Sequence, residues 1–345
     1  MGSDDAALVE AAAAGDARAV GRLISLVEDG SADPAGSSRL RDVTAALVAA
    51  AARREPARVI GVTGAPGVGK STTTSALVSA YRARGMRVGV VAVDPSSPFS
   101  GGALLGDRVR MQEHALDGEV FIRSMASRGH LGGLSWSTPQ ALRVMDVAAC
   151  DVVLIETVGV GQAEVQIASL ADTTAVLVAP GMGDAIQAFK AGILEIADVF
   201  VVNKADRDGA EQASRDLRHM LSLADSTASG SWTPPIRLTV AARDEGIGGV
   251  LDAFEEHWKW LESTGELAAR RRRRAAEEIE GIALAGIRAR LGEVHGAASL
   301  SDLADRLVSG EVDPFSAADR LVEDLASAPE PAPAPAPAPP QAPLA

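Results

Sequence analysis

Short apolar runs alternate with helix-length segments through the middle of the chain. Runs rich in β-branched residues predict strands at 58–63, 87–93, 152–156, 174–179, 198–202 and 236–240. Such runs, apolar on both faces and separated by helix-length connections, are typical of a mostly parallel sheet covered by helices on both sides. We therefore expect an α/β domain over residues 56–265, which binds its ligands at the carboxyl ends of the strands.

Helical patterns flank this central domain. Asp16 is expected to cap a helix in an N-terminal helical extension, residues 1–55. The apolar face of that helix comprises Val20, Leu23, Ile24 and Val27. A C-terminal helical segment over residues 266–327 opens with the arginine run 270–274, which we interpret as a solvated face. Residues 328–345 form a Pro/Ala-rich tail that we expect to be disordered.

A last helix is predicted after Asp313, which would be its cap, with Pro314 at the first position. Its apolar stripe comprises Phe315, Ala318, Leu321, Val322 and Leu325. The spacing leaves open whether this stripe packs within the chain or against a second subunit.

The composition narrows the class of protein. A chain of 345 residues, 47% hydrophobic and 23% charged, can bury one sizeable core and a smaller appendage. The net charge of −13 opposes binding to nucleic acid. Cys150 is the single cysteine, so neither an intrachain disulfide nor a multi-cysteine metal site is expected. The sequence begins without a basic and then apolar leader, and it contains no run of ~18 apolar residues. We therefore expect a cytoplasmic protein that is not embedded in a membrane.

Residues 64–71 follow the first predicted strand and fit the phosphate-loop pattern GxxxxGK[ST]. The glycines let the backbone wrap a triphosphate so that successive N–H groups point at its oxygens. Lys70 is expected to reach the β- and γ-phosphates, and the Ser71 hydroxyl to bind Mg²⁺. The nucleotide-binding residues expected here are Gly64, Ala65, Pro66, Gly67, Val68, Gly69, Lys70, Ser71 and Thr72.

Residues 203–206 read Asn-Lys-Ala-Asp and follow another strand-like run. The Asp206 carboxylate would accept hydrogen bonds from the ring N–H and amine of guanine, whereas adenine would leave that charge unpaired. Lys204 is expected to lie along the base, and Asn203 to tie this loop to the phosphate side. Both motifs together predict GTP or GDP as the ligand.

Phosphoryl transfer depends on positioning and on neutralising charge, so carboxylates near the phosphate loop are candidates for work with Mg²⁺. Mg²⁺ keeps several waters and takes one or two carboxylates. The candidate carboxylates are Asp94, Asp107 and Glu156. Asp94 would otherwise be a turn former before Pro95, and Asp107 a helix cap. The expected catalytic residues are Lys70, Glu156, Asp94 and Asp107, and the expected metal-binding residues are Ser71, Asp94, Asp107 and Glu156.

Three strings, residues 94–111, 151–164 and 180–198, resemble the cobalamin-mutase-associated GTPases in the order in which that family carries them. This family includes MeaB, the methylmalonic aciduria type A protein and ArgK-like proteins once labelled as transport kinases, among the SIMIBI P-loop GTPases. The resemblance extends from about residue 20 to residue 325. It implies a GTP-hydrolysing P-loop NTPase with Glu156 in the active site and Asp94 and Asp107 in or beside the first switch.

The resemblance also implies a function. A protein of this family would be a chaperone for an adenosylcobalamin-dependent acyl-CoA mutase, with methylmalonyl-CoA mutase favoured, and would gate cofactor loading and protect the mutase. Gly159 would meet the γ-phosphate, and a third switch would carry Asp184, Gln187 and Lys190. The C-terminal helical segment would form a homodimer.

One position departs from the family pattern, because Ala241 stands where a serine is common. Guanine O6 would then meet the backbone N–H of Ala242. The histidines show no metal-ligand spacing, and His114 and His130 are interpreted as structural or solvated. Two alternatives stay open at this point: a nickel-insertion GTPase, and a kinase of a small substrate or transport protein.

Overall fold

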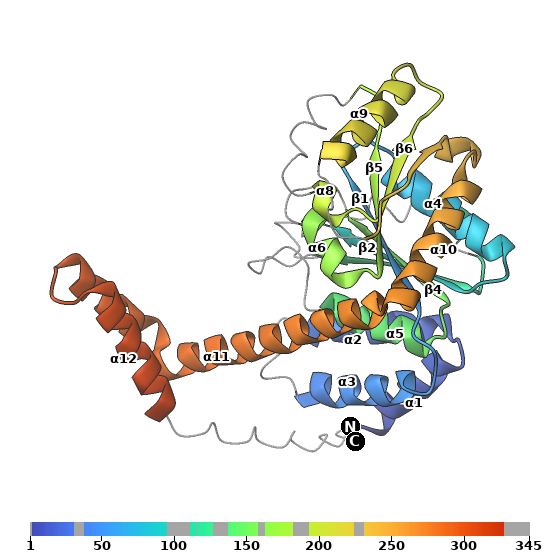
Figure 1. The fold of residues 1–345 in the computed structure, drawn as a ribbon. Helices are drawn as coiled ribbons and strands as arrows, with labels where there is room; N and C mark the ends of the chain where they lie inside the picture. The colour runs from blue at the N-terminus through green and yellow to red at the C-terminus, as the bar shows by residue number, and fades with distance from the viewer. Residues whose placement is uncertain are drawn as a thin grey trace. The chain divides into compact units, whose positions relative to one another are not determined.

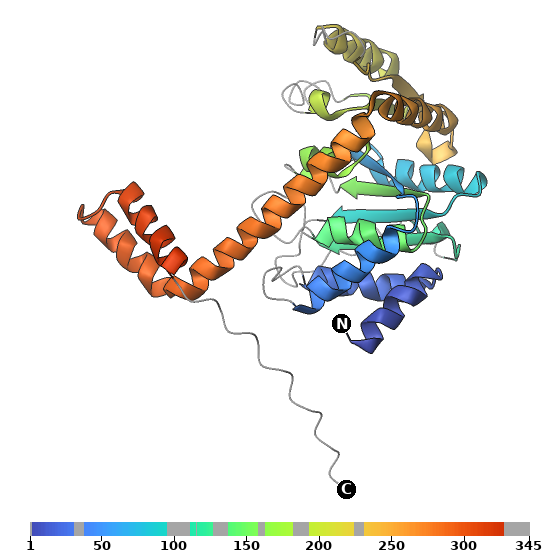
Figure 2. The same cartoon turned by 60° about the horizontal axis from the view of Figure 1, so that its bottom comes forward.

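The computed structural model describes residues 2–30, 38–94, 111–114, 116–126, 137–157, 163–181, 193–223 and 231–327. The chain divides into two compact units, residues 1–279 and residues 280–345. Figure 1 shows the elements along the chain, and Figure 2 shows them from a second direction.

One sheet forms the centre of the first unit. Its strands are β1 (Arg58–Gly64), β2 (Val88–Asp94), β3 (Val120–Ala126), β4 (Val152–Thr157), β5 (Thr173–Val178), β6 (Val199–Asn203) and β7 (Ile236–Thr239). Their order is β3-β2-β4-β1-β5-β6-β7, and all the pairings among these described strands are parallel. The structure thus confirms the α/β fold and the predicted strands, and it adds the edge strand β3.

Helices cover both faces of the sheet (Figure 1). The helices of the first unit are α1 (Ser3–Ala13), α2 (Ala17–Gly30), α3 (Ser38–Ala51), α4 (Lys70–Ala83), α5 (Ser137–Val147), α6 (Ala163–Leu170), α8 (Ile193–Ile196), α9 (Ala210–Leu223) and α10 (Ile247–Thr264). Helix α11 (Glu266–Val308) begins in the first unit and continues into the second, which also holds α12 (Pro314–Ser327). Two 3₁₀ turns, η1 (Gln112–His114) and η3 (Ala241–Arg243), lie in the connections. None of the described helices combines the length and apolarity needed to cross a bilayer.

Successive side chains of β1 enter different cores because side chains alternate across a strand. Val59 joins an apolar cluster with α2, α3 and α5, whereas Ile60 joins one with α4 and α10. A smaller third cluster lies between β6 and α9. The two-sided burial explains why these strands read as continuous apolar runs in the sequence.

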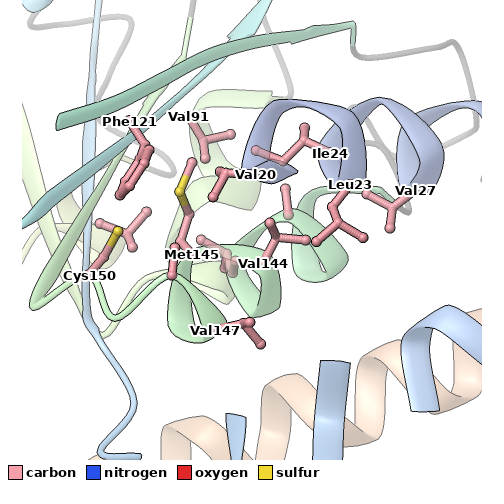
Figure 3. Packing of buried hydrophobic residues seen from close by; sticks show 14 of the residues in the cluster. Val20, Leu23, Ile24, Val27, Val91, Phe121, Val144, Met145, Val147 and Cys150 are labelled. Carbon is pink, nitrogen blue, oxygen red and sulfur yellow. The ribbon is translucent and has the colours of Figure 1, made fainter. Parts of the chain in front are cut away.

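Helix α2 packs against α5 and the strands (Figure 3). Its buried face comprises Val20, Leu23, Ile24 and Val27, as predicted. Asp16 caps the helix, since its Oδ1 accepts hydrogen bonds from the backbone N–H of Arg18 at 2.7 Å and of Ala19 at 3.0 Å. Cys150 is buried in the same cluster, and burial raises the pKa of its thiol.

The amino ends of β5 and β6 are each preceded by a buried aspartate that binds the start of α11. The Asp198 carboxylate accepts one hydrogen bond from each terminal nitrogen of Arg270, both at 2.8 Å. It also accepts a 2.8 Å hydrogen bond from the backbone N–H of Thr174, which ties the start of β6 to β5. His257, fully buried, places its Nε2 3.2 Å from Asp198 Oδ1.

Asp172 repeats this arrangement one strand away. Its Oδ2 accepts hydrogen bonds from the backbone N–H of Val59 at 3.1 Å and from Arg271 Nη2 at 2.9 Å. Arg274 adds a contact to Oδ1 at 3.4 Å and donates to the carbonyl of Leu170. We call Asp172, Asp198, Arg270, Arg271 and Arg274 the arginine clamp.

The arginine clamp corrects the interpretation of residues 270–274 as a solvated face. Three of these arginines are half-buried on the sheet, and Arg272 and Arg273 are exposed. The clamped arginines lie at positions i, i+1 and i+4, which share one side of a helix. The first turns of α11 are therefore part of the first unit.

In the second unit, Asp313 caps α12 as predicted. Its Oδ1 accepts hydrogen bonds from the backbone N–H of Phe315 at 2.9 Å and of Ser316 at 3.0 Å. The stripe that follows includes exposed apolar side chains, with Phe315 81% and Val322 61% exposed. The tail, residues 328–345, lies outside the described residues.

Candidate nucleotide site

The phosphate loop connects the end of β1 to the start of α4. Gly64, the last residue of β1, has φ +142°, and a Cβ there would collide with the carbonyl oxygen of Leu177 on β5. Gly69, with φ +97°, immediately precedes α4, and a Cβ there would collide with the Asn203 amide. Both positions require glycine for conformation and for close approach. The phosphate loop therefore packs closely against β5 at Leu177 and β6 at Asn203.

Lys70 lies inside the loop, with 7% of its surface exposed. Its Nζ donates hydrogen bonds to the carbonyl oxygens of Gly64 at 2.6 Å and Ala65 at 3.2 Å. This arrangement keeps the ammonium group at the amino end of α4. A helix amino end favours anions, so the lysine and the helix attract negative charge to the same place.

Ser71 and Glu156 place two kinds of oxygen donor next to each other. The Ser71 hydroxyl donates to Glu156 Oε1 at 2.6 Å, and both residues are buried. Glu156 lies on β4, in register with Val62 of β1 and Ala92 of β2. Hydroxyl and carboxylate oxygens are the ligand types that Mg²⁺ prefers, so these side chains fit that ion. Among the described residues, no group of three or more His, Cys, Asp or Glu side chains could hold a metal.

Asn203, at the end of β6, connects the phosphate loop to the end of β7 and the residues after it. Its side-chain amide donates to the Val68 carbonyl at 2.9 Å. Its Oδ1 accepts from the Thr239 hydroxyl at 3.2 Å and from the Ala241 backbone N–H at 3.1 Å. The side chain is buried and uses both ends of its amide, so it fixes three segments relative to one another.

The residues that follow Asn203 were expected on the base side of the site, and they lie beside the phosphate loop. Lys204 has φ +58°, and its Nζ donates to the Gly67 carbonyl at 2.6 Å, so the side chain crosses to the phosphate loop. Asp206 keeps 39% of its side chain exposed. Arg243 reaches it from η3, with Nη1 3.5 Å from Asp206 Oδ2. An open carboxylate beside a fixed lysine stem can accept two hydrogen bonds from a planar ligand.

Most of the expected site residues meet at the carboxyl edge of the sheet. The structure brings together residues 64–71, Glu156, Asn203, Lys204, Asp206 and Ala241 around the phosphate loop or its neighbouring strand ends. Thr72 and Ala242 are exposed nearby in the chain. The backbone of Asp94 ends β2 at this edge, next to β4.

Other expected residues lie outside the described part of the chain. They are Asp107, Gly159, His130, Asp184, Gln187, Lys190 and the side chain of Asp94. His114 is described and is structural, because it is buried with its Nε2 2.9 Å from the Ser75 hydroxyl. The sequence motifs did not predict Arg243, although it directly follows the Ala241-Ala242 pair that was expected near the base.

Comparison with known proteins assigns the family. The profile described as "Methylmalonyl Co-A mutase-associated GTPase MeaB" matches residues 20–294. A Pyrococcus horikoshii protein named as a GTPase is 45% identical over 322 residues, covering 92% of this chain and 97% of the relative. The mouse methylmalonic aciduria type A homolog is 38% identical, covering 61% of this chain and 52% of the relative.

The fold agrees with a solved structure. The crystal structure titled "LAO/AO transport system kinase" superposes with a TM-score of 0.69 at 23% identity, covering 95% of this chain and 99% of the other. At this identity the likeness concerns the fold alone. The family profile and the long Pyrococcus match decide the assignment: the chain belongs to the methylmalonyl Co-A mutase-associated GTPases, the MeaB family, and is a GTPase.

Proposed function

We propose that this protein is a GTP-dependent chaperone of an adenosylcobalamin-dependent acyl-CoA mutase, with methylmalonyl-CoA mutase as its client. The observation that carries the proposal is the joined nucleotide site, in which Asn203 links the phosphate loop to the loop that holds Asp206. The family's mutase-associated description supplies the client. GTP binding and hydrolysis would switch the complex, gate cofactor loading and protect the mutase.

The residues around the phosphate loop would divide the work of hydrolysis. Lys70 would bind the β- and γ-phosphates in place of its present bonds to Gly64 and Ala65. Ser71 and Glu156 would hold Mg²⁺ directly or through water, with Asp94 and Asp107 as further oxygen donors. When bound, Mg²⁺ neutralises charge on the phosphate oxygens. In the reaction, water adds to the γ-phosphorus and the bond to the β–γ bridging oxygen breaks, giving GDP and phosphate.

The base side would select guanine. Asp206 would accept the ring N–H and exocyclic amine, Lys204 would lie along the base, and the Ala242 N–H would meet O6. Ala241 offers no hydroxyl, although its N–H still anchors the loop to Asn203. Selection would therefore depend mainly on Asp206.

We also propose a homodimer formed through the C-terminal helices. The exposed Phe315 and Val322 of α12 are the residues that favour an apolar contact with a second copy. Gel filtration with light scattering would measure the mass directly. A monomer across micromolar concentrations would contradict this proposal.

The client can be tested with the purified full-length protein and methylmalonyl-CoA mutase. We expect gel filtration to show a complex whose stability differs between GDP and a non-hydrolysable GTP analogue, and adenosylcobalamin loading to change with the bound nucleotide. The Lys70→Ala variant is the control, since it should lose productive triphosphate binding. A mutase whose association and cofactor loading ignore this protein under GTP would refute the proposal.

The fate of the γ-phosphate tests the reaction. With GTP labelled at the γ-position, we expect inorganic phosphate to appear in solution at the rate of GDP formation. Label transferred to arginine or to a binding protein would show a kinase instead.

A further inference from the structure

The connection between β7 and α10 holds Arg243 at a fixed place beside Asp206. A two-residue bridge closes this connection, with hydrogen bonds from Val240 N to Glu245 O at 3.0 Å and from Glu245 N to Val240 O at 3.3 Å. The Arg243 N–H donates to the Val240 carbonyl at 2.8 Å within it. The backbone at Arg243 is therefore fixed by the bridge and by the Ala241 bond to Asn203.

The guanidinium group binds one carboxylate and faces another. Its Nε donates to Glu245 Oε1 at 2.8 Å, and its Nη2 lies 3.5 Å from Glu245 Oε2. The remaining nitrogen, Nη1, lies 3.5 Å from Asp206 Oδ2. The planar fork is thus oriented from the Glu245 side, and it presents a fixed positive charge to Asp206.

The two distances assign different roles to the carboxylates. A separation of 2.8 Å is a hydrogen bond, whereas 3.5 Å is longer than the usual range for one. The charge attraction persists at the longer distance, but the lone pairs of Asp206 stay available for donors on a base. The hydrogen bond to Glu245 and the charges of Glu245 and Asp206 raise the pKa of Arg243, so the group stays protonated.

We infer that Arg243 is a positioning residue of the nucleotide site, which orients the Asp206 carboxylate for guanine. The inference rests on the proposed recognition of guanine by Asp206. Asp206 is 39% exposed, so without Arg243 its side chain samples more orientations and faces the negative charge of Glu245 unshielded. A carboxylate that is oriented in advance binds its ligand with a smaller loss of conformational freedom.

The substitution Arg243→Ala tests this inference in the full-length protein. We expect the dissociation constant for GDP, measured by titration calorimetry, to rise about 3- to 10-fold, because exposed charge pairs contribute modestly. Arg207→Ala is the matched control, since Arg207 is an exposed arginine in the Asp206 loop and its loss changes the net charge equally. It should change the constant less than ~2-fold, as expected for a surface substitution.

A double-mutant cycle separates positioning from a structural role. If Arg243 acts through Asp206, then Arg243→Ala weakens GDP binding in the wild type but by less than ~2-fold in the Asp206→Asn background. Arg243→Lys should restore part of the affinity, because it keeps the charge and loses the fork. Equal effects of Arg243→Ala in both backgrounds would overturn the inference.

The outcomes also distinguish this inference from the proposed function. If Asp206→Asn leaves the affinity for guanine nucleotides unchanged, Asp206 does not recognise the base. This result would refute both the proposed recognition of guanine by Asp206 and the role of Arg243. An Asp206-dependent affinity without coupling to Arg243 would refute the role of Arg243 alone. The two substitutions could also be coupled in a protein that has no effect on the mutase. That result would support the role of Arg243 and refute the proposed client.

Discussion

Removing Arg270 from the arginine clamp should destabilise the first unit strongly. Arg270 donates two hydrogen bonds of 2.8 Å to Asp198, whose side chain is 7% exposed, and a third of 3.0 Å to the carbonyl of Asp172. The Arg270→Ala variant therefore leaves a buried carboxylate without its main positive partner. The free energy of unfolding falls because neither water nor another arginine replaces the hydrogen bonds that this carboxylate has lost.

The size of the effect follows from the burial. Removing one partner of a buried ion pair destabilises a protein by about 3–5 kcal/mol. Arg270 is 25% exposed and His257 still lies 3.2 Å from Asp198, so we expect about 3 kcal/mol, the lower end of that range. In a unit of this size, that corresponds to a fall in the melting temperature of about 6–12 °C.

Thermal unfolding of the full-length chain, followed by tryptophan fluorescence, would measure this change. The rings of Trp232 and Trp260 lie 4.8 and 5.7 Å from the His257 ring, so their emission reports on the Asp198 region. Arg272→Ala is the matched control, because Arg272 is an exposed arginine of the same run. Its effect should stay within about 0.5 kcal/mol.

The pH dependence gives a second measurement of the same pair. Burial raises the pKa of Asp198, but the contacts with His257 and Arg270 outweigh it, so the pKa lies below its usual value. A carboxyl with a lowered pKa stabilises the fold above its unfolded value, about 3.9, and this stabilisation is lost as the pH falls through the folded value. The deficit of Arg270→Ala should thus be largest near neutral pH and shrink below about pH 4.

Equal melting temperatures of Arg270→Ala and Arg272→Ala would refute the reasoning. So would a deficit that persists undiminished in acid, because it would point to lost packing rather than to an unpaired carboxylate.

Three further substitutions test the site. Gly64→Ala should destabilise the protein by at least about 2 kcal/mol in urea unfolding, because the left-handed backbone and the Leu177 carbonyl leave no room for a methyl group; a change below 0.5 kcal/mol, roughly that of a surface site, would contradict this. Asn203→Ala should weaken both GDP and inorganic triphosphate binding in calorimetry, since it frees both loops, and a loss confined to GDP would contradict the proposed link. Glu156→Gln should lower kcat for GTP on the order of 10–100-fold while the dissociation constant changes less than ~3-fold, and unchanged turnover would remove Glu156 from the mechanism.

The fold was largely predictable because its strands are buried on both faces. Each apolar run produced a strand within one or two residues of its predicted ends. Strand β3 was missed because it carries Arg123 and Ser124 in its middle, which an edge strand tolerates where a central strand does not. An apolar run is therefore a good signal for the centre of this sheet and a weak one for its edge.

The arginine run shows what charge patterning cannot decide. A helix with five consecutive arginines near its start has the same sequence pattern whether it faces water or a row of buried aspartates. The available signal was the position of Asp172 and Asp198, each directly before an apolar strand, where a carboxylate would be buried unless a cation reached it. Only the contacts between distant segments show that Arg270 and Arg271 are those cations.

The candidate site was predictable as far as its motifs extended. The phosphate loop and residues 203–206 lie together, because carboxyl ends of parallel strands share one edge. Arg243 belongs to no motif, and its closeness to Asp206 results from the closed connection after β7. The roles of Asp94, Asp107 and Gly159 stay predictions.

The bonds made by Asn203 restrict how this site can change in evolution or in the laboratory. Asp206 lies outside that set of bonds, so under the proposed recognition of guanine we expect that its side chain can be exchanged to select another purine while phosphate binding is retained. Asn203 has no such freedom, since one substitution there disconnects Val68 from Thr239 and Ala241 together. If Asp206 selects the base as proposed, nucleotide preference is therefore an adjustable property of this scaffold, whereas the connection that Asn203 makes between the two loops is not.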